Sequence, residues 1–206
     1  EIIFTEETVY DSSVSLMQRD RDTDDIYISY STPKTPSRTF IYNLKTKEKK
    51  LVKEQIIPSG HNSNDYIVER LECEGHDGRI IPITITRKKT TKLDGNSNLL
   101  LYGYGSYGNS MWPSFSSTRL SLINRDIIWA TAHIRGGMER GMKWWKEGKL
   151  MNKKNTFQDY ISCAKFLIDK KYTSKKKIIG MGGSAGGLLM GAVVIEKPDL
   201  FLGMLM

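Results

Sequence analysis

The second half of the chain contains short segments in which nearly every residue is apolar. Such continuous runs are typical of strands that are buried on both faces, as in a parallel sheet. They occupy residues 99–102, 127–132 and 177–181 and the tail from Phe201 onward. Because the chain between them has room for helices, the pattern predicts an α/β fold with a doubly wound, mostly parallel sheet.

Two of the connecting segments carry helical patterns. In the first, apolar residues recur every three or four positions and make one stripe. This stripe consists of Phe157, Tyr160, Ile161, Ala164, Leu167 and Ile168. Thr156 and Asp159 are expected to form a capping box at its start. Residues 185–196 are apolar nearly all round, which predicts a buried helix that ends before Pro198.

The first part of the chain has short runs of strand-forming residues separated by polar turns. Strands are expected at residues 2–4, 26–30 and 38–42. With a charged turn at 43–50, residues 1–50 have the pattern of one antiparallel blade. Residues 51–64 include proline, glycine and asparagine and are expected to form a linker. Residues 65–206 are expected to form a second domain that opens with a hairpin around residues 75–78.

The overall composition fits a folded protein. Of the 206 residues, 39% are hydrophobic and 26% are charged, which excludes wholesale disorder. The longest nearly apolar stretch, residues 185–195, is shorter than the ~20 residues that span a bilayer, so no membrane segment is expected. Cys73 and Cys163 are too few for a disulfide scaffold and lack the spacing of paired metal ligands. We therefore expect two buried free thiols, a cytoplasmic location, and no metal or organic cofactor.

The net charge of +8 is concentrated at one end of the chain. Residues 135–206 carry 14 of the 31 basic side chains and 6 of the 23 acidic ones, so the whole excess lies there. A basic half invites a nucleic-acid interpretation. However, the lysines at 170–171 and 175–177 flank an expected helix end and a turn, where solvated lysines are common. No aromatic platform or groove-reading helix accompanies them, so no nucleic-acid partner is expected.

The strongest chemical signal is the run Gly-Gly-Ser-Ala-Gly-Gly at residues 182–187. It lies between a predicted buried strand and a predicted buried helix, which is the context of a G-x-S-x-G nucleophile elbow. In such a turn the backbone of Ser184 is strained and its hydroxyl projects above the sheet, while the following helix N-terminus favours an oxyanion. The glycines of the elbow are Gly182, Gly183 and Gly186. The alternative is a glycine-rich turn with an idle serine.

A second glycine pattern, G-x-G-x-x-G, spans residues 103–108 directly after a predicted strand. A dinucleotide site with this pattern also needs an acid at the end of the next strand. That strand is followed by His133 and Arg135 instead, and bulky Tyr104 and Tyr107 obstruct a phosphate. The same loop is where α/β-hydrolases place an oxyanion donor. The hydroxyl of Tyr104 is therefore a candidate for that role, with an aromatic wall residue as the alternative.

The segment after the strand at 127–132 holds three further polar candidates. Arg135 and Glu139 are candidates for orienting a substrate, but pairing with each other is the favoured interpretation. His133 precedes Ser184 in the chain and lies at a strand end. We therefore expect a packed, hydrogen-bonded histidine there and not a general base.

Together these segments resemble the prolyl oligopeptidase family of serine peptidases, and within it oligopeptidase B. The matching segments are residues 101–108, 132–137, 155–157, 181–191 and 198–201. The resemblance implies a β-propeller capping an α/β-hydrolase domain, with residues 1–50 as the last part of the propeller and 65–206 as the first part of the hydrolase. It also implies that Ser184 is the nucleophile and that the Tyr104 hydroxyl and the Ala185 N–H form the oxyanion hole. The implied substrates are short peptides, cleaved after Arg or Lys.

One departure from the family pattern changes this expectation. No histidine follows Ser184, and the only acids after it are Glu196 and Asp199. The family's aspartate and histidine, and the acids that would hold a basic side chain of the substrate, are therefore expected beyond Met206. We expect a truncated piece of a longer enzyme, inactive without the remainder of its catalytic domain and propeller. A prolyl-specific or acylaminoacyl peptidase, an esterase of the same fold, and a truncated non-catalytic binding module remain open.

Overall fold

The computed structural model describes residues 7–16 and 22–206, so the strand expected at residues 2–4 lies outside the described residues. The chain divides into two compact units. The first contains the residues up to Asn64 together with Trp112–Ser117, and the second contains Asp65–Met111 and Thr118–Met206. The boundary after Asn64 coincides with the start of the second predicted domain, but the sequence did not predict that Trp112–Ser117 belongs to the first unit.

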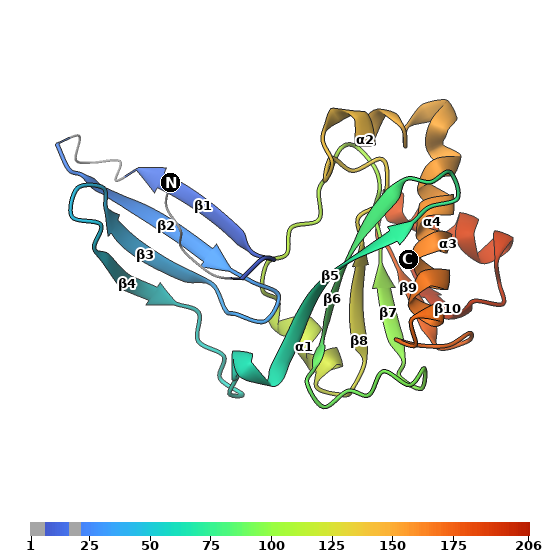
Figure 1. The fold of residues 1–206 in the computed structure, drawn as a ribbon, viewed down its shortest axis with the longest axis horizontal. Coiled ribbons are helices and arrows are strands. Elements are labelled where there is room, and N and C mark those ends of the chain that lie inside the picture. The colour runs from blue at the N-terminus through green and yellow to red at the C-terminus, as the bar shows by residue number, and fades with distance from the viewer. Residues whose placement is uncertain (1–6, 17–21) are drawn as a thin grey trace. The chain divides into compact units, whose positions relative to one another are not determined.

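The first unit is built around a four-stranded antiparallel sheet in the order β1-β2-β3-β4 (Figure 1). Its strands are β1 (Asp11–Leu16), β2 (Asp25–Ser31), β3 (Arg38–Asn43) and β4 (Lys49–Glu54). In the central pair Ile28 lies opposite Phe40. Ile26, Ile28 and Tyr42 form a small buried cluster. The two central strands are therefore those that the sequence predicted from their strand-forming residues.

The two edge strands were not predicted, and β4 corrects the expected start of the linker. Lys49–Glu54, read as part of a charged turn and a linker, pairs with β3 along its length. All six of its residues are exposed, so the segment lacks the alternation of buried and exposed positions that reveals a strand. Lysines on an edge strand also discourage pairing with other chains.

The second unit contains a six-stranded sheet in the order β10-β9-β7-β8-β6-β5. Its strands are β5 (Tyr66–Glu74), β6 (Ile80–Lys88), β7 (Leu99–Tyr102), β8 (Ile128–Ala132), β9 (Ile178–Met181) and β10 (Phe201–Leu205). The strands β10, β9, β7 and β8 run parallel to one another. β6 runs antiparallel to β8, and β5 runs antiparallel to β6. The predicted hairpin, the parallel strands and the α/β class are confirmed. Burial on both faces, however, holds only for β7: β8 and β9 fully bury one face, and β10 is mostly exposed beyond Phe201.

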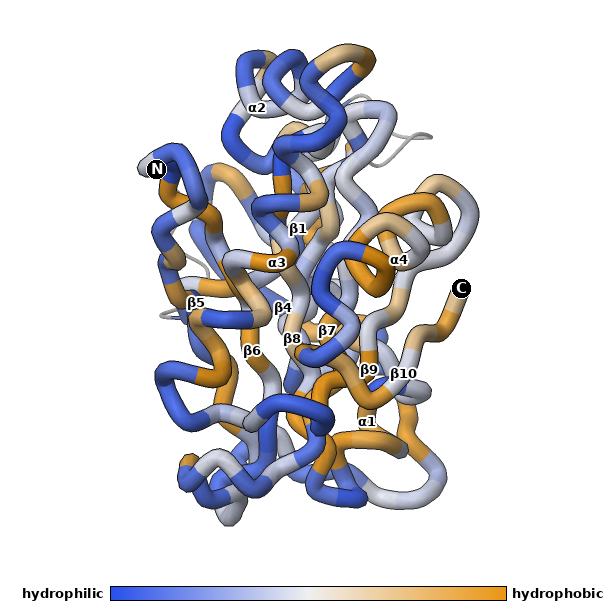
Figure 2. Tube along the Cα trace, turned by 90° about the vertical axis from the view of Figure 1, so that its right-hand side faces the viewer, coloured by the Kyte–Doolittle hydropathy of each residue, from blue (hydrophilic) through white to orange (hydrophobic). Residues whose placement is uncertain are grey.

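Besides the strands, the described residues form four α-helices and two short 3-10 turns. The α-helices are α1 (Ser117–Ile123), α2 (Met142–Lys146), α3 (Lys153–Asp169) and α4 (Ala185–Glu196), and the 3-10 turns are η1 (Ser63–Asp65) and η2 (Leu150–Asn152). Tyr160 and Leu167 of α3 and Leu189 of α4 join the apolar side chains of the sheet in one core. Figure 2 shows the hydrophobic stretches of β6 and β9. The hydroxyl of Tyr160 donates to the carbonyl of Leu101 at 2.6 Å, which ties α3 to the central strand β7.

The beginning of α3 differs from the prediction. The helix starts at Lys153, three residues before the expected cap, and its N-cap residue Asn152 makes no side-chain capping hydrogen bond. Thr156 instead donates its hydroxyl to the carbonyls of Arg135 and Gly148 at 2.8 and 3.1 Å. A capping box is a pattern of residues that are close in the chain. Here the side chains that suggested it bind groups in other parts of the fold instead.

The burial of α4 also differs from the prediction. Gly186, Leu189, Met190 and Val193 are buried. Leu188 and Ile195, however, are 61% and 83% exposed. The helix therefore buries one face against the sheet and exposes apolar side chains on another, although its sequence is apolar on both.

Cys73 and Cys163 are buried and free, as the composition predicted. Burial raises the pKa of the Cys163 thiol well above its ordinary value. Within residues 7–16 and 22–206, no helix has both the length and the apolar character needed to cross a membrane. No cluster of three or more His, Cys, Asp or Glu side chains in these residues could hold a metal ion.

Candidate active site

Ser184 occupies the turn between β9 and α4. The strand ends at Met181 and the helix begins at Ala185, so the strand–turn–helix context expected from the sequence is present. The backbone of Ser184 has φ 56° and ψ −119°. A positive φ is costly for a residue with a Cβ and persists only where the surrounding structure enforces it. The residue is exposed, so its hydroxyl is accessible to a ligand.

Two glycines allow this turn to close tightly. A Cβ on Gly182 would lie 2.7 Å from the carbonyl oxygen of Gly186 and 2.8 Å from that of Gly103. A Cβ on Gly186 would lie 3.1 Å from the same Gly103 oxygen. By contrast, a Cβ on Gly183 would meet nothing within 4 Å. The close approach therefore needs glycine at 182, leaves a Cβ at 186 only a tight fit, and does not need glycine at 183.

This difference predicts opposite outcomes for two neighbouring substitutions. Gly182→Ala should displace the backbone of the turn and lower the rate of Ser184 labelling by a fluorophosphonate at least about ten-fold, since misplacing a reacting group by about 1 Å costs on the order of 10²-fold. Gly183→Ala should leave the labelling rate within about two-fold. Both rates are measured on the full-length protein at equal concentration. Equal rates for the two variants would contradict this account of the turn.

Tyr104 lies beside the same turn. It follows β7 in a loop whose first residue, Gly103, donates its N–H to the carbonyl of Met181 at 3.0 Å. The ring of Tyr104 borders α4, because a Cβ on Gly186 would lie 3.6 Å from its Cδ2. The side chain is partly buried. The loop after β7 therefore brings a phenolic hydroxyl to the end of the sheet that carries Ser184.

The N-terminus of α4 supplies a second kind of donor. The N–H groups of Gly186 and Gly187 donate to the carbonyls of Gly183 and Ser184 at 2.8 and 2.9 Å. Ala185 is the first residue of the helix, where an N–H has no acceptor within the helix. The turn thus has the ring of Tyr104 beside Gly186 and places Ser184 at the positive end of a helix, which is suited to a developing oxyanion.

Arg135 does not have the substrate-orienting role considered for it, and it does not pair with Glu139. The side chain is 1% exposed. Its backbone N–H and its Nε donate to Oδ2 of the fully buried Asp159 at 3.0 and 2.8 Å, and Nη1 donates to Oδ2 of Asp77 at 2.6 Å. Burial alone would lower the pKa of Arg135, but these hydrogen bonds raise it above its ordinary value. Arg135 is a buried, doubly paired cation that ties the loop after β8 to α3 and to the β5–β6 turn.

The partly buried Glu139 and the buried His133 form a separate group. Oε1 of Glu139 accepts the N–H of Met111 at 3.0 Å and lies 3.5 Å from Nδ1 of His133. On its other side, Nε2 of His133 lies 2.7 Å from Oγ1 of Thr84. Burial lowers the pKa of His133, and Arg70 contributes in the same direction. His133 is a packed, hydrogen-bonded histidine, as predicted.

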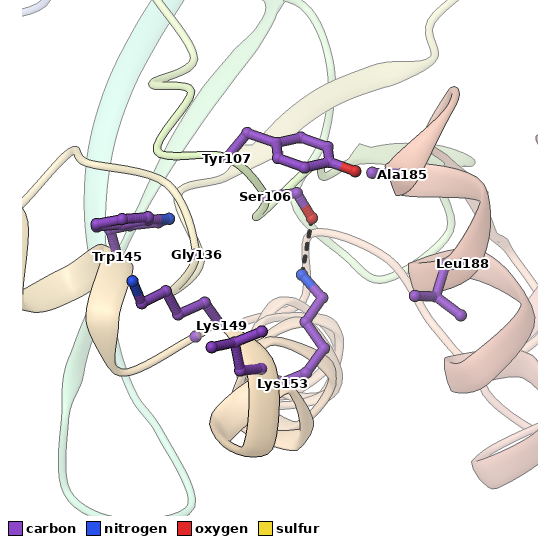
Figure 3. Close-up of a pocket in the computed structure, with 10 residues that line it drawn as sticks. Ser106, Tyr107, Gly136, Trp145, Lys149, Lys153, Ala185 and Leu188 are labelled. Atoms are coloured by element: carbon purple, nitrogen blue, oxygen red, sulfur yellow. Dashed lines mark hydrogen bonds between the residues drawn. The ribbon is translucent and has the colours of Figure 1, made fainter.

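A cavity of about 540 Å³ lies next to the turn (Figure 3). Ala185 and Leu188 line it from α4, and Ser106 and Tyr107 line it from the loop after β7. Tyr107 is 78% exposed, with its hydroxyl directed toward Ala185. Lys153 lies at the opposite side, where its Nζ donates to Oγ of Ser106 at 2.8 Å.

Lys153 and Asp159 are the residues of this region that sequence reasoning missed. Lys153 stands in a lysine-rich segment, and Asp159 was assigned to a helix cap. No spacing pattern links either residue to the loop that it contacts, because Lys153 is separated from Gly105 by 48 positions. Only the packing of α3 against the loops reveals their roles.

Comparison with known proteins identifies relatives of this chain. The prolyl oligopeptidase family model matches residues 113–206. The chain is 44% identical to the dipeptidyl aminopeptidase BI of Pseudoxanthomonas mexicana over 87% of its length, which is 25% of that protein. It is 40% identical to protease 2 of Moraxella lacunata over 95% of its length, which is 28% of that protein. The chain thus spans about a quarter of the length of the curated relatives it matches.

Solved structures of the same kind match nearly the whole chain. Oligopeptidase B from Leishmania major is 36% identical with a TM-score of 0.87, over 98% of this chain and 28% of that one. Oligopeptidase B from Trypanosoma brucei, solved with covalently bound antipain, is 35% identical with a TM-score of 0.90, over 98% of this chain and 29% of that one. The match in coordinates extends to both units of the chain.

Proposed function

The chain belongs to the prolyl oligopeptidase family of serine peptidases, and from this premise we propose that Ser184 is the nucleophile of a serine-type oligopeptidase. The observation that carries the proposal is the turn between β9 and α4. It exposes Ser184 in a strained conformation at a helix N-terminus. For a serine without a catalytic role, this strained backbone would only cost stability. For a nucleophile, the same conformation exposes the hydroxyl to substrate and fixes its position.

In the proposed mechanism, Oγ of Ser184 attacks the carbonyl carbon of a peptide bond and its proton passes to a histidine base. The carbonyl oxygen becomes an oxyanion, which accepts hydrogen bonds from the Tyr104 hydroxyl and the Ala185 N–H. The tetrahedral intermediate collapses to an acyl-enzyme when the histidine protonates the leaving amine. Water, deprotonated by the same histidine, then attacks the acyl-enzyme and releases the acid. Each oxyanion donor of this kind lowers the activation barrier by on the order of 3 kcal/mol.

The base in this mechanism is not one of the chain's three histidines. His133 is buried and hydrogen-bonded to Thr84, and no histidine follows Ser184 in the sequence. In α/β-hydrolases the order along the chain is Ser, then Asp or Glu, then His. We therefore assign the base and its orienting carboxylate to residues outside these 206, in what we call the full-length protein. The chain by itself is then inactive, because a serine without its base is a poor nucleophile.

The first unit fits a role in substrate selection. Its four antiparallel strands, β1 to β4, have the size of one propeller blade. We assign them to the end of a β-propeller that limits access to short peptides. The solved relatives of the whole chain, which include both units, support this assignment. The two buried free thiols are in keeping with a cytoplasmic location.

The proposed specificity is cleavage after Arg or Lys, and it rests on the similarity to oligopeptidase B structures. A preference for proline is the second candidate. The chain is also 40% identical to the prolyl endopeptidase of Dictyostelium discoideum over 86% of its length, which favours that alternative. Acylaminoacyl peptidases and esterases of the same fold would use the same nucleophile.

A panel of fluorogenic peptides that differ only in the residue before the scissile bond tests the proposal. With the full-length protein, kcat/KM for Arg and Lys peptides should exceed that for the Pro peptide at least about 100-fold. A preference for the Pro peptide would instead identify a prolyl peptidase. If the protein hydrolyses no peptide or ester and Ser184 takes up no fluorophosphonate, it is a non-catalytic binding module and the proposed function is wrong.

A further inference from the structure

The loop that carries Tyr104 is held at the next residue, Gly105. Gly105 has φ 63°, and a Cβ there would lie 2.8 Å from Cγ1 of Ile134 and 2.9 Å from the carbonyl oxygen of Arg135. A Cβ on Gly136 would collide with the carbonyl of Gly105. The Gly105 carbonyl thus occupies a space that exists only because residue 136 has no side chain.

A single lysine binds this carbonyl from the other side. Nζ of Lys153, the first residue of α3, donates to the Gly105 carbonyl at 2.5 Å and to Oγ of Ser106 at 2.8 Å. Figure 3 shows the side chain extending from the helix across the cavity to Ser106. Hydrogen bonds from a charged donor are stronger than those from a neutral one. The loop is therefore held from two sides at the peptide unit between Gly105 and Ser106, the second one after Tyr104.

Lys153 is bound to the loop and not to an acid. The salt bridges within the described residues do not include it. Its side chain is partly buried, and burial lowers its pKa. A partly buried ammonium group loses part of its hydration. An ion pair with a carboxylate would normally offset this loss, but Lys153 has no such partner among the described residues. Its two hydrogen bonds to the loop are the visible compensation.

We propose that Lys153 is a positioning residue that fixes the Tyr104 hydroxyl where it donates to the oxyanion. This inference rests on the proposed function. Oxyanion donors act at about 2.7–3.1 Å, and a misplacement of about 1 Å can cost on the order of 10²-fold in rate. The Gly105 carbonyl belongs to the peptide unit between Gly105 and Ser106, one Cα away from the peptide unit that joins Tyr104 to Gly105. Releasing this carbonyl frees the backbone angles of Gly105, and the point from which the Tyr104 side chain projects then shifts.

The test compares Lys153→Met with Lys154→Met in the full-length protein. Both residues are lysines in the first turn of α3, but Lys154 is exposed, and the hydrogen bonds to Gly105 and Ser106 come from Lys153. Lys153→Met should lower kcat about 10- to 100-fold with KM changed less than about two-fold, and Lys154→Met should change neither. Lys153→Arg, which keeps charged donors on a long stem, should retain more of kcat than Lys153→Met. A kcat for Lys153→Met equal to that of Lys154→Met would overturn the proposal.

A double-mutant cycle with Tyr104→Phe separates positioning from a general structural role. If Lys153 acts through the Tyr104 hydroxyl, Lys153→Met should lower kcat less than about three-fold further in the Tyr104→Phe background. An undiminished loss in that background would mean that Lys153 acts independently of Tyr104, and the proposal would be wrong.

A crystal structure of the Lys153→Met protein gives a readout that does not depend on activity. It should show the Gly105 carbonyl and the Tyr104 side chain displaced by about 1 Å relative to the wild type, and an unmoved Tyr104 would overturn the proposal. If the wild type itself forms no adduct at Ser184, the proposed function fails. The position of Tyr104 in the variant then still decides whether Lys153 holds the loop.

Discussion

Replacing Ser184 by alanine in the full-length protein is expected to lower kcat about 10⁶-fold. Removing the nucleophile leaves substrate binding and the oxyanion donors but no group that forms the acyl-enzyme. Both the wild type and the variant are assayed with the same Arg peptide. Mass spectrometry after fluorophosphonate treatment should place the adduct of the wild-type protein on the peptide that contains Ser184.

Ser121→Ala is a matched control for this substitution. Ser121 is an exposed serine in α1 whose hydroxyl donates to the carbonyl of Thr118. Its replacement should leave kcat within about two-fold of the wild type and the fluorophosphonate adduct unchanged. If Ser184→Ala retained a rate within about ten-fold of the wild type, another residue would be the nucleophile and the site assigned to the turn after β9 would be wrong.

Replacing Arg135 by alanine is expected to lower the free energy of unfolding by about 3–5 kcal/mol. The substitution leaves the carboxylate of Asp159 fully buried without its cation, and an uncompensated buried charge carries a penalty of this size. The measurement is urea denaturation of the full-length protein, with the change read from the unfolding transition of the domain that contains Arg135. A lower midpoint with an unchanged slope would show a loss of native stability and not a change in the unfolded state.

Asp77→Asn provides the comparison for Arg135→Ala. Asp77 also bonds Arg135, but its side chain is 35% exposed, so water compensates for much of what the substitution removes. Its replacement should cost no more than about 1 kcal/mol, the range of surface ion pairs. Asp199→Asn, which removes the exposed pair with Lys175, should have no measurable effect. Equal losses for Arg135→Ala and Asp77→Asn would contradict the assignment of the buried pair as the dominant contact.

Elements with a strong internal pattern were predictable. The strand at residues 99–102 is buried on both faces, as its continuous apolar run indicates, and the strand at 178–181 fully buries one face. Edge strands were not, because all residues of β4 are exposed and carry no apolar periodicity. The exposed side of α4 was mispredicted for a related reason. An apolar sequence indicates that burial of its side chains is favourable, but it does not show which element packs against them.

The sequence by itself determined the turn that presents Ser184. Its ingredients, a strand, a glycine-rich turn and a helix, are adjacent in the chain, although the approach of the Gly103 carbonyl to the turn is a tertiary contact. It likewise indicated that Tyr104 follows a strand of the same sheet. The structure places β7 directly beside β9 and parallel to it, so the two loops lie at the same edge of the sheet.

Only the tertiary structure decided how the surrounding polar residues pair. Arg135 binds Asp159 and Asp77, which are 24 and 58 positions away, and Lys153 reaches Gly105 across 48 positions. Glu139 was the nearer candidate for Arg135, yet it binds the N–H of Met111. Charge in a sequence shows that a side chain needs a partner, whereas the choice of partner depends on which elements pack together. The position of α3 across the loops after β7 and β8 makes that choice here.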